Sequence, residues 1–139
     1  MKSNLIYNEE LLAGKTALVT GGASGLGRSI AVGLSQVGAN VIIVSRQEEV
    51  LAKAAKEISD ETDREVTYDV VDIRDIESVA QLSQRHENID ILVNNAGGQF
   101  PQKARDFTPN GWRSVIDLNL NGTWNMTQAF GNKMLEGVG

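Results

Sequence analysis

Cysteine is absent from this 139-residue chain, and histidine occurs once, as His86. The lack of cysteine excludes disulfides, thiolate catalysis and cysteine-based metal sites, and it is compatible with the cytosol. A single histidine cannot form a metal-binding histidine cluster, so we predict no metal site. The 13 basic residues are outnumbered by 18 acidic ones, which gives a net charge of −5. Such a chain is, as a whole, a poor binder of nucleic acid or anionic membranes.

Long apolar runs are also missing, and no run approaches the ~18 residues that a membrane span needs. The start, residues 1–7, has one lysine and no apolar core of signal-peptide length. We therefore expect a cytoplasmic protein. The apolar fraction of 41% and the charged fraction of 22% are ordinary for one soluble globular domain.

Short apolar runs alternate with helical patterns along the chain. Strands are expected at 16–20, 41–44, 66–71 and 89–93, and helices from the turn at Gly27 to Gly38, over 48–59, over 75–86, and from Thr108-Pro109 to about Leu135. Apolar strands alternating with helices predict an α/β fold with a parallel sheet that helices cover on both faces. Right-handed crossovers make this a doubly wound sheet. We expect a lead-in at 1–13 and one domain at 14–139.

A glycine-rich turn, Gly21-Gly22-Ala23-Ser24-Gly25-Leu26-Gly27, joins the first strand to the first helix. Glycines let the backbone turn tightly and approach a phosphate, and the following helix offers free N–H groups and its positive dipole end. Ser24 can add a hydroxyl donor. The spacing does not match G-x-G-x-x-G, and an ordinary glycine-rich turn is the alternative. We predict that the turn binds the pyrophosphate of a dinucleotide.

The end of the second strand carries Ser45 and Arg46, close to the ~20 residues after the glycine turn at which the ribose is recognised. A site for NAD favours Asp or Glu there, and a carboxylate would repel a 2′-phosphate. The guanidinium of Arg46 can instead bind that phosphate. We predict a preference for NADP(H) over NAD(H), with a solvated surface arginine as the alternative.

Three patterns occur in order along the chain: Thr20-Gly21 with Gly25 and Gly27, then Asn94-Asn95-Ala96-Gly97, then Asn119 within the last helix. Together they resemble the signatures of the short-chain dehydrogenase/reductase family, over about residues 14–139. The resemblance implies a Rossmann-type fold and an NAD(P)-dependent oxidoreductase. It implies a cofactor site made of Thr20, Gly21, Ser24, Gly25, Leu26, Gly27, Ser45, Arg46, Asp72, Ile73, Asn94, Asn95, Ala96 and Gly97.

The resemblance also implies individual roles. Asp72 would lie near the adenine amino group, with the backbone of Ile73 beside it, and the Asn94-Asn95 pair would border the cofactor ribose. Asn119 would bend its helix and hold a water of the proton relay, as a catalytic residue. The alternatives are a loop or capping carboxylate for Asp72, turn-forming asparagines after a strand, and a solvent-facing Asn119. Asp75 fits the capping role better than Asp72.

A finer resemblance lies in Gly97–Pro101, Gly111-Trp112 and Asn121–Thr123. It points to the branch that reduces enoyl- or 2,4-dienoyl-CoA thioesters with NADPH. The substrate would then be a small molecule such as an acyl-CoA thioester. Lys103 and Arg105 could meet an acidic CoA, or they could belong to a solvated loop. The family further implies that the full-length parent is a homo-oligomer.

The family's catalytic set is a serine and a Tyr-x-x-x-Lys pair. Tyr7 and Tyr68 are the two tyrosines here, and four residues later stand Leu11 and Asp72. The resemblance implies that the set lies beyond Gly139, on a fifth strand and the next helix. We therefore expect a sheet truncated after its fourth strand and following helix, and a fragment that is inactive alone. The alternative is a catalytically inactive nucleotide-binding module or a half-domain that needs a partner chain. Substrate, reaction direction and oligomeric state stay open.

Overall fold

A parallel four-stranded sheet forms the centre of the molecule in the computed structural model, which describes residues 6–137. The strand order is β3-β2-β1-β4, and every adjacent pair is parallel. The predicted α/β fold is thereby confirmed. Residues 1–5 of the predicted lead-in and 138–139 of the predicted domain lie outside the described residues. The strands are β1 (Thr16–Thr20), β2 (Asn40–Ser45), β3 (Val66–Val70) and β4 (Ile91–Val93).

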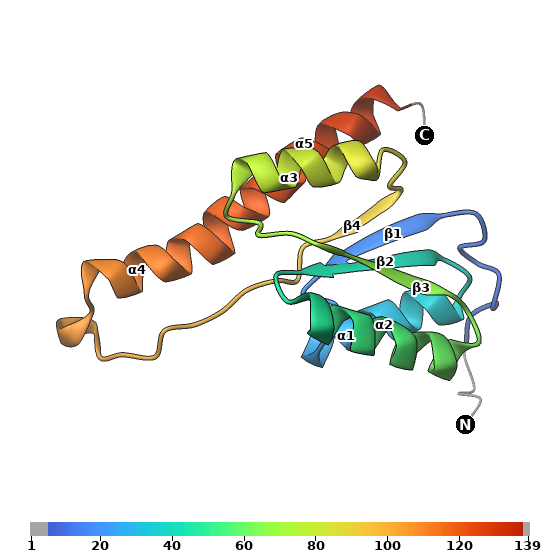
Figure 1. Ribbon diagram of the computed structural model, residues 1–139, viewed down its shortest axis with the longest axis horizontal. Helices are drawn as coiled ribbons and strands as arrows, with labels where there is room; N and C mark the ends of the chain where they lie inside the picture. The colour runs from blue at the N-terminus through green and yellow to red at the C-terminus, as the bar shows by residue number, and fades with distance from the viewer. Residues whose placement is uncertain (1–5, 138–139) are drawn as a thin grey trace.

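Helices cover both faces of the sheet, α1 and α2 on one face and α3 and α5 on the other (Figure 1). A long helical arm precedes and includes α5, and its first part projects beyond the sheet (Figure 1). Among the helices of residues 6–137, none combines the length and apolar character that crossing a membrane requires. The helices are α1 (Gly25–Gln36), α2 (Glu48–Thr62), α3 (Ile76–Arg85), the 3₁₀ turn η1 (Ala104–Asp106), α4 (Pro109–Ile116), the π-helical segment η2 (Asp117–Gly122) and α5 (Thr123–Glu136).

The core has two halves because successive strand residues point to opposite faces. Ala17 and Val19 of β1 belong to the cluster under α1 and α2, whereas Leu18 belongs to the cluster under α3 and α5. All three side chains are fully buried. The same alternation holds along β2. Burial on both faces explains why these strands read as unbroken apolar runs in the sequence.

The lead-in is packed against the corner between α1 and β2. The amide of Leu12 donates to the carbonyl oxygen of Val37 at 2.8 Å, and the Leu12 side chain packs against the first core cluster. Arg64, just before β3, pairs with the carboxylate of Glu10 and donates to the carbonyl oxygen of Glu9. The described part of the lead-in is therefore tied to the domain.

Two predicted helix caps are confirmed. The carboxylate of Asp75 accepts from the amide of Glu77 at 3.0 Å, and the hydroxyl of Thr108 accepts from the amide of Gly111 at 3.0 Å. Pro109 then occupies the first turn of α4, where no intrahelical donor is lost. These caps set the start of α3 and of the arm.

Several predicted boundaries differ from the structure, most clearly those of β4 and α2. β4 begins at Ile91 rather than Ile89, where the regular register with β1 starts opposite Ala17. Asp90 bonds Thr16 just before it, through its own amide to the carbonyl at 2.9 Å and through its carboxylate from the amide at 2.8 Å. The second helix continues to Thr62, whose hydroxyl donates to the carbonyl of Ile58 and accepts from Ser35. The predicted last helix runs over 109–136 but contains the π-helical η2.

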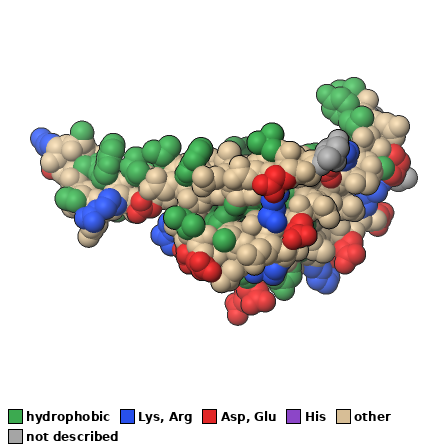
Figure 2. Space-filling view, turned by 90° about the horizontal axis from the view of Figure 1, so that it is seen from above, with side chains coloured by type: hydrophobic (Ala, Val, Ile, Leu, Met, Phe, Trp, Pro, Cys, Tyr) green, Lys and Arg blue, Asp and Glu red, His purple; other side chains and the backbone are tan. Residues whose placement is uncertain are grey.

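Large apolar side chains are exposed along the arm. Trp112, Leu120 and Trp124 are 62%, 62% and 59% exposed. Figure 2 shows apolar side chains gathered along the projecting arm. In the same arm, Met126 and Phe130 of α5 are buried against the sheet. The arm is therefore anchored by its second half.

A charged cluster fastens the end of α3 to the edge strand β3. The carboxylate of Asp69 accepts from Nε of Arg85 at 2.8 Å and from Nε2 of His86 at 2.8 Å. Burial alone would raise the pKa of Asp69, but the hydrogen bonds from Arg85 and His86 outweigh it, so the pKa lies below its ordinary value. The carboxylate is thus ionised at neutral pH.

Asp69→Asn should lower the free energy of unfolding by about 1–2 kcal/mol at pH 7, because it removes charge-assisted hydrogen bonds. A carboxylate with a depressed folded pKa stabilises above its unfolded pKa of about 3.9, and this contribution is lost as the pH falls through the folded pKa. Urea unfolding should therefore show the difference between variant and wild type shrinking below about pH 4.

Asp60→Asn is the matched control. Asp60 forms an exposed i,i+4 pair with Lys56 on α2, so its loss should cost less than about 0.5 kcal/mol at any pH. An Asp69→Asn defect that stays constant down to pH 3 would contradict the ionic origin of the cluster's contribution.

Candidate functional site

A cleft of about 330 Å³ opens at the carboxyl ends of the strands. β1 lies between β2 and β4, so the strand order reverses beside it, and ligands of doubly wound sheets bind at such reversal points. The cleft is lined by the glycine turn, the end of β2, the segment after β3, the segment after β4 and η2. Its lining residues are Gly21, Ala23, Ser24, Val44, Ser45, Arg46, Gln47, Val50, Val71, Asp72, Ile73, Ala96, Gly97 and Leu118.

The glycine turn directs the start of α1 toward this cleft. Gly21 and Gly25 have φ of +65° and +54°, a left-handed conformation that a side chain would strain. Among residues 6–137, no acceptor is bonded to the first α1 amides, those of Gly25, Leu26 and Gly27. Ser24 is exposed and its hydroxyl makes no capping bond. The amides, the hydroxyl and the helix dipole are therefore available to an anion.

Two further glycines allow close packing behind the turn. A Cβ on Gly22 would come within 2.5 Å of Ile43 on β2. A Cβ on Gly27 would overlap the carbonyl of Gly21 and Nδ2 of Asn95. Since one of these neighbours is backbone, α1 can approach the turn this closely only with glycine at position 27.

A hydrogen-bond network ties the end of β4 to the end of β1. The Thr20 hydroxyl accepts from the amides of Asn95 at 3.0 Å and Ala96 at 2.9 Å, and it donates to the carbonyl of Val93. Nδ2 of Asn95 donates to the carbonyls of Thr20 at 3.0 Å and Gly21 at 3.3 Å. Asn95 therefore supports the glycine turn from behind.

Asn119 joins the arm to the segment after β4. Its Nδ2 donates to the carbonyl of Gly98 at 2.8 Å, and its Oδ1 accepts from the amide of Gly98 at 2.8 Å. Asn119 lies within η2, where the helix widens to the π form. Asn119 is exposed, and both ends of its side-chain amide bond the backbone of Gly98, so its catalytic role stays a prediction.

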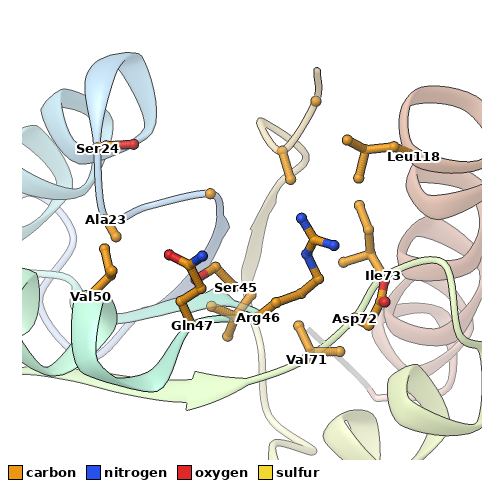
Figure 3. A pocket seen from close by; sticks show the side chains of 14 residues that line it. Ala23, Ser24, Ser45, Arg46, Gln47, Val50, Val71, Asp72, Ile73 and Leu118 are labelled. Atoms are coloured by element: carbon orange, nitrogen blue, oxygen red, sulfur yellow. The ribbon is translucent and has the colours of Figure 1, made fainter. Parts of the chain in front are cut away.

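Arg46 is the basic residue that lines the cleft. It is exposed at the end of β2, directly after Ser45, and Figure 3 shows its side chain extending from the strand end toward Ile73. The residues on either side of Arg46 in the chain are Ser45 and Gln47, so neither of them carries a carboxylate.

Asp72 follows β3, next to the end of β2, where the amide of Val71 donates to the carbonyl of Ser45 at 2.8 Å. Its carboxylate accepts from Nε of Arg74 at 2.9 Å and from Nη2 of Arg74 at 2.6 Å. These bonds, and the positive charges of Arg74 and Arg46, hold the pKa of Asp72 below its ordinary value. Asp72 is thus ionised and paired.

The model of the short chain dehydrogenase family matches residues 15–139. The chain belongs to this family. The resemblance inferred from the glycine turn, the Asn94–Gly97 segment and Asn119 is thereby confirmed, and so is the classification as an oxidoreductase by family.

Individual relatives agree with this assignment. The chain is 37% identical over 130 residues to an oxidoreductase of Caenorhabditis elegans named uncharacterized, covering 90% of this chain and 42% of that protein. It is 35% identical over 136 residues to a protein of the same organism named probable 2,4-dienoyl-CoA reductase 3, covering 94% and 44%. A short chain dehydrogenase from Escherichia coli CFT073, solved in complex with NADPH, superposes with a TM-score of 0.86 at 31% identity, covering 95% and 58%.

The chain spans about half the length of the curated relatives it matches. Within that span, the short-chain dehydrogenase fold brings many of the predicted site residues to one cleft. Those that line it are Gly21, Ser24, Ser45, Arg46, Asp72, Ile73, Ala96 and Gly97.

The other predicted residues lie around or behind the cleft. Thr20, Gly27 and Asn95 form its support, and Leu26 is 79% exposed at the start of α1. Asn94 donates to the hydroxyl of Thr127 on α5 rather than lining the cleft. Their roles toward a cofactor stay predictions.

Some residues of the site were not predicted. Val50, Val71 and Leu118 line the cleft, and Arg74 pairs with Asp72. The spacing of Arg74 from Asp72 was visible in the sequence, whereas the approach of Leu118 depends on the placement of the arm.

Gly27→Ala should destabilise the protein by about 1–3 kcal/mol, because overpacking against backbone forces α1 away from the turn. Gly33→Ala in the same helix is the matched control, since nothing lies within 4 Å of its added Cβ. That change should stabilise by about 0.5–1 kcal/mol. Thermal unfolding of both variants measures the contrast, and equal effects would refute the close packing at Gly27.

Proposed function

We propose that this chain binds NADP(H) in the cleft, as the cofactor half of a reductase or dehydrogenase that transfers hydride between nicotinamide and a carbonyl or enoyl carbon. The observation that carries the proposal is that one cleft combines two anion-binding features. These are the glycine turn, whose first α1 amides have no acceptor among residues 6–137, and Arg46 at the end of the neighbouring strand. Bound nicotinamide supplies the hydride chemistry, and the protein supplies position and electrostatics.

The pyrophosphate would lie at the start of α1. Gly21, Gly25 and Gly27 are needed there for conformation or for space, so a dinucleotide phosphate can approach the backbone closely. The amides of Gly25 and Leu26 and the hydroxyl of Ser24 would donate to its oxygens. This fit rests on the cradle itself, which any added Cβ would strain or fill.

The 2′-phosphate would contact Arg46, with Ser45 beside it. Charge-assisted hydrogen bonds of this kind contribute roughly 1.5–3 kcal/mol, which corresponds to about tenfold to a hundredfold in affinity. The related short chain dehydrogenase solved with NADPH supports a phosphorylated cofactor. The proposed preference is therefore NADP(H) over NAD(H).

The remaining cofactor contacts would lie along the same cleft. Asp72 and Ile73 would border the adenine, and Asn94, Asn95, Ala96 and Gly97 would border the ribose and nicotinamide. Asn119 would serve the proton relay that the resemblance implies, by holding a water. Its bonds to Gly98 support a positioning contribution at this end of the site.

An acyl-CoA thioester is the proposed substrate class. The relative named probable 2,4-dienoyl-CoA reductase 3 supports it, as do the exposed Lys103 and Arg105 on the loop before α4. The serine, tyrosine and lysine of the family's chemistry would come from outside this cofactor half. We further propose that the whole protein is a cytoplasmic homo-oligomer.

Arg46→Asp tests the cofactor proposal. The variant should lose NADPH affinity by roughly tenfold to a hundredfold, because it removes the phosphate contact and adds a repelling carboxylate. Its NADH affinity should hold or rise, since a carboxylate at this strand end can accept from the ribose hydroxyl. Titration of purified protein, followed by nucleotide fluorescence, measures both constants.

Arg113→Gln on α4 is the control, because the side chain of Arg113 bonds Pro109 and Asn110 of its own helix and, within residues 6–137, does not line the cleft. It should bind both nucleotides as the wild type does. A wild type that binds neither nucleotide, or an Arg46→Asp variant that keeps full NADPH affinity, would refute the proposal.

A further inference from the structure

Two charged side chains of opposite sign line the cleft, Arg46 and Asp72. The two charges interact electrostatically, since the charge of Arg46 contributes to the depressed pKa of Asp72. Figure 3 shows the Arg46 guanidinium extending toward the side of the cleft that holds Asp72 and Ile73. An unpaired Asp72 would therefore attract this guanidinium and repel a phosphate dianion in the same space.

Arg74 forms an ion pair with the carboxylate of Asp72. Its Nε donates to Oδ1 at 2.9 Å and its Nη2 donates to Oδ2 at 2.6 Å, a bidentate arrangement that engages both oxygens. The pKa of Arg74 is raised chiefly by its hydrogen bond to Asp72, with a smaller contribution from the charge of Asp117. Arg74 therefore brings a second cation to a region that would otherwise hold one charge of each sign.

The Arg74 side chain is not needed to close the loop in which it lies. The amide of Arg74 donates to Oδ1 of Asp72 at 3.0 Å, and the amide of Asp75 donates to the carbonyl of Asp72 at 3.0 Å. Both bonds use backbone donors and remain when the side chain changes. The side chain is also partly exposed, so its loss leaves no buried void.

We propose that Arg74 is a specificity-determining residue for the 2′-phosphate, acting through Asp72. By neutralising that carboxylate it leaves the Arg46 guanidinium available to the phosphate and keeps the local charge positive. The inference rests on the proposed NADP(H) function and deepens it, because it assigns part of the cofactor preference to a residue outside the cleft lining.

The readout is the ratio of NADPH to NADH affinity, because adenine, pyrophosphate and nicotinamide are common to both nucleotides. Arg74→Gln should lower this ratio by roughly fivefold, the scale of one partly screened charge interaction. The double variant Asp72→Asn with Arg74→Gln should restore it to about the wild-type value, since carboxylate and cation disappear together. Arg74→Lys keeps the charge and should retain most of the ratio.

Asp72→Asn alone is a second variant that does not depend on the folding of Arg74→Gln. It releases Arg74 as a free cation, so the ratio should rise, by roughly threefold at low salt, and the gain should shrink as ionic strength increases. Circular dichroism of each variant verifies that it is folded before titration.

The outcomes separate this inference from the function on which it rests. If Arg46→Gln lowers the ratio but Arg74→Gln and Asp72→Asn leave it unchanged, the proposed function stands and the role of Arg74 is wrong. Equal losses of NADPH and NADH affinity in Arg74→Gln would mean a structural role and would also overturn it. If the wild type does not prefer NADPH, or Arg46→Gln leaves the ratio unchanged, the NADP(H) proposal fails and the inference fails with it.

Discussion

The attachment of the end of β4 to the end of β1 is the constraint on which the site depends. Thr20 is 1% exposed, and its hydroxyl accepts from the amides of Asn95 and Ala96. Loss of the hydroxyl would remove this acceptor from the Ala96 amide, at about 1–3 kcal/mol, whereas the Asn95 amide keeps its bond to the carbonyl of Val93 at 3.1 Å. The same network places Nδ2 of Asn95 on the carbonyl of Gly21, against which Gly27 packs. The glycine-turn side and the Ala96-Gly97 side of the cleft are thus held at a fixed separation.

Charge in this protein is arranged locally rather than globally. The chain carries a net charge of −5, yet the amides of α1, Arg46 and Arg74 gather positive charge at one edge of the sheet. An acidic surface elsewhere does not prevent anion binding, because fields are screened within about 8–10 Å at ordinary ionic strength. The same local arrangement accounts for the proposed choice between cofactors, which differ by one phosphate.

Sequence reasoning succeeded where the determinant is local. β1 was predicted at its observed bounds, 16–20, because a buried apolar run ends at a glycine, and the caps at Asp75 and Thr108 follow from residue type. It failed where a partner lies far along the chain: the regular pairing of β4 with β1 starts only at Ile91, and Thr62 at the end of α2 accepts from Ser35 of α1. The π-helical η2 interrupts the 3.6-residue period, and Leu118 reaches the cleft only through the placement of the arm.

We propose that the glycine turn and the strand ends beside it form one dinucleotide site. The most direct test is a two-dimensional ¹H–¹⁵N NMR titration of the protein with NADP⁺. The largest amide shifts should fall on Ser24, Gly25 and Leu26, with a second group at Ser45–Gln47, because phosphates would contact these positions. Saturable shifts confined to other surfaces, with the glycine turn unchanged, would contradict it.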